Sequence, residues 1–147
     1  MDELLAAGAV AFSDDGQPIA TSRIMRKALE HAKRYQTVII DHCEDKSLSA
    51  QGVMNEGATS RGLGLKGIPA SSEENFVARD INLAEEMDAG VHLAHLSTRG
   101  SVELVRQAKA RGVKVTAEVA PHHLVLDDSL LEHCDTNLNV NPPIRSA

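Results

Sequence analysis

Predicted helices alternate with short apolar strands along most of this chain, and this alternation restricts its fold more than any other feature. Apolar residues recur at helical spacing in three segments, and each segment runs into a short apolar stretch. The predicted helices are residues 21–35, 71–90 and 101–112, and the predicted strands are residues 37–41, 91–95 and 113–119. This order predicts β/α units around a parallel sheet, with the strand at 37–41 buried on both faces.

Local signals set the expected limits of these helices. Thr21 or Ser22 is available to cap the first helix, and Ser71–Glu74 has the form of a capping box at the start of the second. Gly90 and Gly112 are expected to end the second and third helices, since glycine readily adopts the left-handed conformation found just beyond helix ends.

The two ends of the chain do not complete the pattern. Asp2–Ala7, followed by Gly8, has the form of the last turns of a helix, and a strand is predicted at once at Ala9–Phe12. Residues 141–147 contain two prolines and predict no further strand. We therefore expect an α/β fold whose four strands form about half of an eight-stranded β/α (TIM-type) barrel. Periodicity alone leaves an open doubly wound sheet as an alternative.

The segment of residues 52–70 separates the first two complete units, and it is longer than a routine connection between a strand and a helix. The segment is rich in glycine and contains Arg61, Lys66 and Pro69. It is either a functional loop or a solvated surface excursion. Its glycines do not follow a predicted strand, as those of a phosphate-binding loop would, so no nucleotide site is assigned to it.

Composition narrows the class of protein further. Aromatic residues make up 2% of the chain, and the basic residues are scattered at a formal net charge of −6, so a nucleic-acid partner is not expected. Two cysteines without a CxxC pair fit a reducing compartment. The N-terminus is acidic and no apolar run reaches about 18 residues, so neither a signal peptide nor a membrane span is predicted. We expect a cytoplasmic protein that acts on a small molecule.

Imidazole and carboxylate side chains recur at the carboxyl ends of the predicted strands, which is where β/α folds place their catalytic groups. These residues are Asp14, Asp15, Asp41, His42, His95 and Glu118. Converging at one barrel mouth, such groups would suit zinc, which favours imidazole nitrogen and carboxylate oxygen. The alternative for each histidine is a structural, hydrogen-bonded role.

Six segments, in this order, resemble motifs of the dihydroorotases, which belong to the metal-dependent amidohydrolase superfamily. The segments are residues 11–16 (AFSDDG), 40–45 (IDHCED), 67–80 (GIP followed by RD), 92–98 (HLAHLST), 118–124 (EVAPHHL) and 141–145 (NPPIR). Together they span nearly the whole chain. The resemblance implies that residues 1–147 form a partial barrel domain, comprising about strands four to seven.

The resemblance also implies a set of site residues. Asp15, His42 and His95 would be zinc ligands, in a centre of one or two ions, and Asn141 would contact the dihydropyrimidine ring of the substrate. Asp15 would stand where many related enzymes carry a carboxylated, metal-bridging lysine. That difference favours bacterial dihydroorotases over the hydantoinases, dihydropyrimidinases and allantoinases, which remain the alternative enzymes.

Family members hydrolyse dihydroorotate reversibly to N-carbamoyl-L-aspartate in pyrimidine biosynthesis. The family's catalytic aspartate, on the eighth strand, and its His-x-His pair, on the first, have no counterpart in the 147 residues. The resemblance therefore implies that this chain carries no catalytic residue of its own and that the isolated chain is inactive.

Other interpretations stay open. The chain could instead be a non-catalytic dihydroorotase-like partner of aspartate transcarbamoylase, or an unrelated open α/β binding domain. A barrel sector would leave unpaired strand edges, which predicts self-association. His122 and His123 are expected to have a structural hydrogen-bonding role in a turn, and Arg145 either pairs with a substrate carboxylate or forms a structural ion pair.

Overall fold

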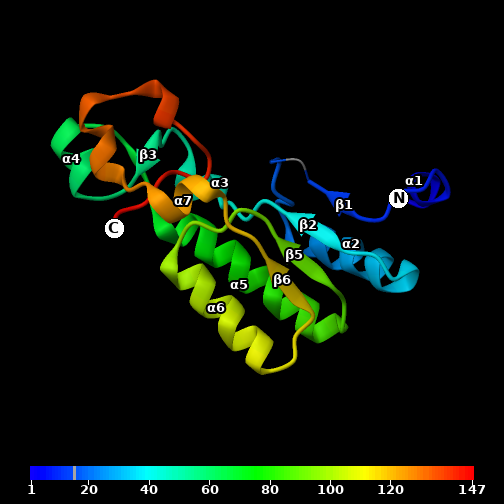
Figure 1. The fold of residues 1–147 in the computed structure, drawn as a ribbon. Coiled ribbons are helices and arrows are strands. Elements are labelled where there is room, and N and C mark those ends of the chain that lie inside the picture. Colours follow the sequence, from blue (N-terminus) through cyan, green and yellow to red (C-terminus); the bar gives the residue numbers. More distant parts are fainter. Residues whose placement is uncertain (15) are drawn as a thin grey trace.

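The computed structural model of the protein describes residues 1–14 and 16–147. In this part of the chain, four parallel strands form the main sheet in the order β1-β2-β5-β6 (Figure 1). Their bounds are Phe12–Ser13 for β1, Ile39–Asp41 for β2, Val91–Leu93 for β5 and Val115–Ala117 for β6. The predicted parallel β/α arrangement is confirmed, although each strand is shorter than the sequence predicts.

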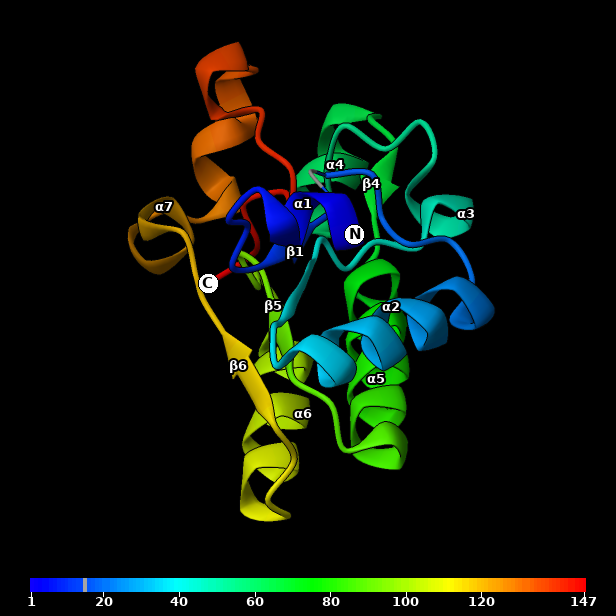
Figure 2. The same cartoon turned by 90° about the vertical axis from the view of Figure 1, so that its right-hand side faces the viewer.

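Three long helices pack against one face of this sheet, as the two views in Figures 1 and 2 show. They are α2 (Ser22–Tyr35), α5 (Ala70–Met87) and α6 (Arg99–Ala110). The predicted cap of the first helix is confirmed, because the Thr21 side chain accepts a hydrogen bond from the backbone N–H of Ile24. A shorter helix, α1 (Asp2–Ala6), precedes β1, and Gly8 follows it with a φ of +98°, a conformation that suits glycine.

Two predictions about α5 are wrong. The helix ends at Met87 rather than at Gly90, because Asp88 adopts the left-handed conformation at φ 51°. Lys33 and Lys114 pair with the Asp88 carboxylate there. The predicted capping box does not form, since Pro69 stands at the N-cap without a side-chain hydrogen bond. The Glu73 side chain instead accepts hydrogen bonds from the loop that follows β5.

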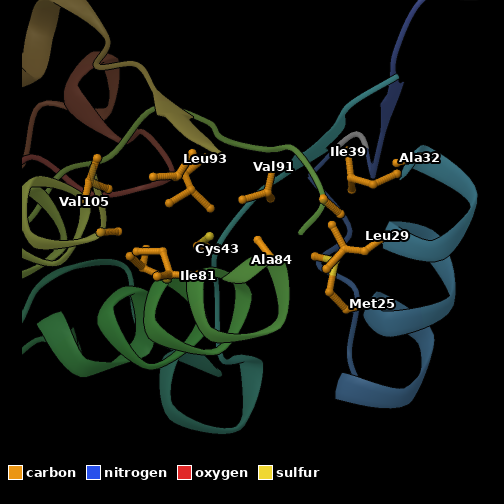
Figure 3. Packing of buried hydrophobic residues seen from close by; sticks show 14 of the residues in the cluster. Met25, Leu29, Ala32, Ile39, Cys43, Ile81, Ala84, Val91, Leu93 and Val105 are labelled. Atoms are coloured by element: carbon orange, nitrogen blue, oxygen red, sulfur yellow. The ribbon is translucent and has the colours of Figure 1, made fainter. Parts of the chain in front are cut away.

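The core lies between the sheet and the three helices. Figure 3 shows Val91 and Leu93 pointing from the sheet toward apolar side chains of the helices. The buried core side chains include Met25, Leu29 and Ala32 from α2, Val77, Ile81 and Ala84 from α5, and Val105 and Ala108 from α6. Burial of these groups supplies most of the driving force for folding in a chain with few aromatic residues.

The strand register divides each strand between two faces. Ile39, Val91 and Val115 are aligned and buried against the helices. Their neighbours Ile40 and His92, which are aligned on the other face, are only partly buried. The prediction that the strand at 37–41 is buried on both faces is therefore wrong for this chain.

Residues 52–70 fold into a small unit of their own, which the sequence did not predict. It contains β3 (Met54–Asn55), α4 (Ala58–Leu63) and β4 (Gly67–Ile68), and the two strands form a separate parallel pair. Figure 1 shows this unit beyond the carboxyl ends of the main strands, beside the two 3-10 segments η1 (Asp128–His133) and η2 (Thr136–Leu138). The Asn55 amide donates to the buried Asp128 carboxylate at 2.7 Å, which ties the unit to η1.

Two short helices complete the carboxyl end of the sheet. α3 (Lys46–Ser49) follows β2, and α7 (Pro121–Val125) follows β6. Asp45 caps α3 by accepting from the N–H of Ser47. In the described residues, no helix combines the length and the apolar character that a membrane span requires. The polar side chains that the sequence singled out lie in the loops at this end of the sheet, after the carboxyl ends of the strands.

Candidate metal centre

The structure brings His42 and His95 together at the carboxyl end of the sheet. His42 directly follows β2, and His95 lies two residues beyond β5. Their rings meet edge to face, with His42 Nδ1 only 3.0 Å from His95 Nε2. Two histidines that are 53 residues apart in sequence thus direct one ring nitrogen each at a common point.

An unusual backbone conformation aims His95 at this point. Val91 and Leu93 face the helices, and strict alternation along an extended strand would send residue 95 to the same side. His95 instead has a φ of +37°, in the left-handed region that non-glycine residues rarely adopt. This turn breaks the alternation, and the strain is of the kind that folded proteins keep at functional sites.

Glu44 orients the other side of the His42 ring, and Asn141 in turn contacts Glu44. His42 Nε2 lies 2.9 Å from Glu44 Oε2, and the His42 side chain is almost completely buried. Asn141 Nδ2 donates a hydrogen bond to the Glu44 carboxylate at 3.3 Å, and it lies 3.3 Å from His42 Nε2. A carboxylate at Nε2 holds the proton there, so the lone pair of His42 is left on Nδ1, facing His95.

The two nitrogens fit a shared metal ion. Ligands bound to one tetrahedral zinc at roughly 2.0–2.1 Å lie about 3.3 Å apart, close to the observed separation of 3.0 Å. Burial and the neighbouring His42 lower the pKa of His95, which favours the neutral imidazole that binds metals. His95 Nδ1 is buried and has no hydrogen-bond partner among the described residues. The carboxylate-to-histidine contact at Glu44 is the usual support of such a ligand.

The Asp-Asp-Gly segment also reaches the centre. The Asp14 carboxylate accepts a hydrogen bond from the backbone N–H of His42 at 2.9 Å, and so fixes the position of that residue. Asp15, the third predicted ligand, lies outside the described residues. Its role as a ligand therefore stays a prediction.

His92 and Glu118 form a second polar pair on the same face of the sheet. His92 Nδ1 lies 2.8 Å from the Thr116 hydroxyl, and its Nε2 lies 3.6 Å from Glu118. The Glu118 side chain is 59% exposed, whereas that of His42 is 4% exposed. Glu118 therefore follows its strand as predicted, and among the described residues it makes no hydrogen bond with His42 or His95, although its charge partly offsets the lowering of the His95 pKa.

A buried acidic cluster lies on the helix side of β2, behind the candidate centre. Asp41, Cys43 and Asp80 place possible ligand atoms within 4.8 Å of one another. Arg79 contacts both carboxylates, at 3.4 Å for Asp41 and 2.7 Å for Asp80. Burial and the adjacent Asp80 raise the pKa of Asp41 to about 9, so one carboxyl of the pair keeps its proton. One proton and one guanidinium balance two carboxylates, which accounts for this cluster without a metal ion.

Arg145 and His123 have structural partners. Arg145 donates to the Ser97 hydroxyl, to Asn55 Oδ1 and to the backbone oxygen of Ile68, at distances of 2.9–3.1 Å. Arg145 Nη2 also lies 3.8 Å from the Glu73 carboxylate, so the structural ion pair, one of the two alternatives for Arg145, is present. His123 Nε2 lies 3.0 Å from the backbone oxygen of Pro142, in agreement with the predicted structural role. The predicted turn around it is the short helix α7.

Sequence reasoning missed two residues that support the centre. Glu44 belongs to the segment 40–45, but its contact with His42 depends on a side-chain direction that spacing does not give. Glu73 was assigned to a capping box, yet its carboxylate holds the loop after His95. The signal for both is an acidic residue close to a strand end, which is too common to single them out.

Glu44→Gln is expected to weaken metal binding by about 10–100-fold, because a neutral amide holds the proton on His42 Nε2 more weakly than a carboxylate does and raises the basicity of the ring less. Titration of the metal-free chain with Co²⁺ measures this change. Glu30→Gln, at an exposed position on α2, is the control and should bind Co²⁺ like the parent. Equal affinities in all three proteins would contradict the assigned role of Glu44.

Comparisons with known proteins show which family the chain resembles. A family described as dihydro-orotase-like matches residues 1–101. The chain is 61% identical over all 147 residues to a dihydroorotase of Pelotomaculum thermopropionicum, of which it covers 34%. It is 53% identical to a dihydroorotase of Geobacter metallireducens, of which it covers 35%. The chain therefore spans about a third of the length of these relatives.

Solved structures show the same fold in a larger setting. A D-hydantoinase superposes on 97% of this chain with a TM-score of 0.75 and 25% identity, and the match covers 34% of that enzyme. An L-hydantoinase (dihydropyrimidinase) from Arthrobacter aurescens gives a TM-score of 0.77 over 99% of this chain at 21% identity. The four strands are thus a sector of a β/α barrel, and the open doubly wound alternative is excluded.

Proposed function

Because the chain belongs to the dihydroorotase-like family, we propose that its residues serve a dihydroorotase, which hydrolyses the cyclic amide of dihydroorotate reversibly to N-carbamoyl-L-aspartate. The observation that carries this proposal is the convergence of His42 Nδ1 and His95 Nε2 at 3.0 Å, with Glu44 fixing the tautomer of His42. This pair is suited to holding a metal ion at a barrel mouth.

His42, His95 and Asp15 are the proposed ligands of zinc, as one ion or two. When bound, zinc supplies Lewis acidity, which polarises an amide carbonyl and lowers the pKa of water. Glu44 and Asp14 hold His42 in place through its ring nitrogen and its backbone N–H. The proposal assigns no proton acceptor to residues 1–147, and places that group on another part of the barrel.

Asn141 is the proposed contact for the dihydropyrimidine ring. It is exposed, yet its amide lies 3.3 Å from both His42 and Glu44, so a ring held by this amide would lie beside the metal ligands. Residues 1–147 would correspond to about strands four to seven of the barrel. The edge strands β1 and β6 would then pair with further strands, or with other copies of the chain.

The setting of the protein follows from the proposed function. A dihydroorotase that serves pyrimidine biosynthesis would work in the cytoplasm on a small molecule, without nucleic acid or membrane. Aspartate transcarbamoylase, which makes carbamoyl aspartate, is a proposed partner. Both points rest on the family and not on a contact within residues 1–147.

Grafting tests the proposal. Residues 1–147 replace the matching segment of the Pelotomaculum dihydroorotase, to which they are 61% identical, and the chimera and the isolated chain are assayed with dihydroorotate, hydantoin and dihydrouracil. We expect the chimera to hydrolyse dihydroorotate and the isolated chain to be inactive. Preference for hydantoin or dihydrouracil would identify another cyclic amidohydrolase. A folded but inactive chimera would favour the non-catalytic partner.

A further inference from the structure

Two consecutive residues at the start of α5 each hold one of the loops that carry the candidate ligands. Ser72 contacts the loop after His42, and Glu73 contacts the loop after His95. Both residues are almost completely buried, at 1% and 3% exposure. The first turn of α5 therefore lies between the two loops and touches both.

Glu73 binds its loop through several donors. Its carboxylate accepts from the backbone N–H groups of Ser97 and Thr98, at 3.0–3.1 Å, and from the hydroxyls of the same two residues. Arg145 Nη2 lies 3.8 Å from this carboxylate and balances its charge. Thr98 is the N-cap of α6, so Glu73 also places negative charge where the dipole of that helix favours it. A buried carboxylate with these partners leaves the loop little freedom.

Ser72 binds the other loop in both directions. Its hydroxyl donates to the backbone oxygen of Asp45 at 3.1 Å, and its own backbone oxygen accepts from the Asp45 N–H at 2.7 Å. Asp45 lies three residues after His42 and one after Glu44. The contact therefore fixes the segment from which both His42 and its supporting carboxylate project.

We propose that the first turn of α5 sets the distance between His42 and His95, with Ser72 and Glu73 as positioning residues. This inference rests on the proposed metal centre. His95 has a strained backbone at φ +37°, which persists only if neighbouring contacts over-determine it, and the Glu73 contacts begin two residues further along. Loss of the Glu73 charge lets the loop relax and moves the His95 nitrogen away from that of His42.

The test compares Glu73→Gln, Ser72→Ala and the control Glu74→Gln. The control makes the same chemical change one residue further along α5, at a carboxylate that lies beside Gly100 and makes no hydrogen bond to either ligand loop among the described residues. The charge of Glu74 reaches the loop after His95 only indirectly, through Arg145. In the metal-free chain, ¹⁵N signals of the histidine rings report their surroundings, and Co²⁺ titration reports the affinity. Circular dichroism confirms that each variant is folded.

Glu73→Gln should shift the His95 ring signals, Ser72→Ala those of His42, and Glu74→Gln neither. Glu73→Gln should also weaken Co²⁺ binding by about 10–100-fold, as loss of an outer partner does in other metal sites. A folded Glu73→Gln variant with parental His95 signals and affinity would overturn the proposal. If that variant does not fold, Ser72→Ala decides through the His42 signals. If the parent binds no Co²⁺, the proposed function loses its metal centre, while the ring signals still decide on the positioning role.

Discussion

Arg79→Met is expected to lower the free energy of unfolding by about 3–5 kcal/mol, because it leaves two buried carboxyl groups without their cation. Asp41 and Asp80 are both fully buried, and the Arg79 guanidinium contacts each of them. The same guanidinium donates to the backbone oxygen of Ile19 at 2.6 Å and lies 3.9 Å from the centre of the Phe76 ring. Denaturant unfolding of the parent and the variant measures the difference.

The reason for this large effect lies in the charges that remain. Burial raises the pKa of Asp80, and burial together with Asp80 raises that of Asp41. One proton neutralises one of the two carboxyl groups of Asp41 and Asp80. The other carboxylate stays negative, and among the described residues no cation other than Arg79 lies within contact distance of it. Removing one partner of a buried ionic group costs far more than the group contributes as a whole.

Arg26→Met is the matched control for this prediction. Arg26 pairs with Glu86 at 2.6 Å, but both side chains are about half exposed, so its loss should cost at most about 1 kcal/mol. Asp41→Asn in the Arg79→Met background should recover part of the loss, since it removes one of the two acids. Equal losses for the two arginine variants would show that the buried cluster does not depend on Arg79.

The sequence predicted the repeating part of the fold because that part depends on local patterns. The spacing of Met25 and Leu29 marks a helix, and the apolar stretch ending at Asp41 marks a strand, whatever lies around them. The small unit at residues 52–70 was missed because its strands have only two residues each and pair with one another. Such short strands carry no period that a sequence pattern can show.

The candidate site was predicted by kind of residue but not by geometry. His42 and His95 stand at strand ends, which the sequence shows, and the structure places them in contact. The positive φ of His95 and the contacts of Glu73 arise from tertiary packing, so local spacing could not reveal them. Arg79 and Asp80 stood out in the sequence only as part of a motif. The ion pairs that Arg79 forms with the buried Asp41 and Asp80 depend on which side chains the fold buries together.

His95→Ala is expected to weaken Co²⁺ and Zn²⁺ binding by more than about 100-fold, beyond the range found when only an outer partner is removed. The variant deletes one of the two nitrogens that converge at 3.0 Å and leaves His42 as the only ring nitrogen of this pair. His95 is half-buried near the start of the loop that follows β5, so a small side chain there should leave the core packed. Isothermal titration with each metal measures the loss.

His92→Ala separates the effect of a ligand from that of any histidine on this sheet. His92 lies three residues earlier and pairs with Thr116 and Glu118, away from His42. It should therefore keep parental metal affinity, whereas His95→Ala should lose it. In the chimera with the Pelotomaculum dihydroorotase, turnover should follow the same order. If both variants keep their affinity, the convergence of His42 and His95 is a structural hydrogen bond, and the metal centre would have to be sought elsewhere in the protein.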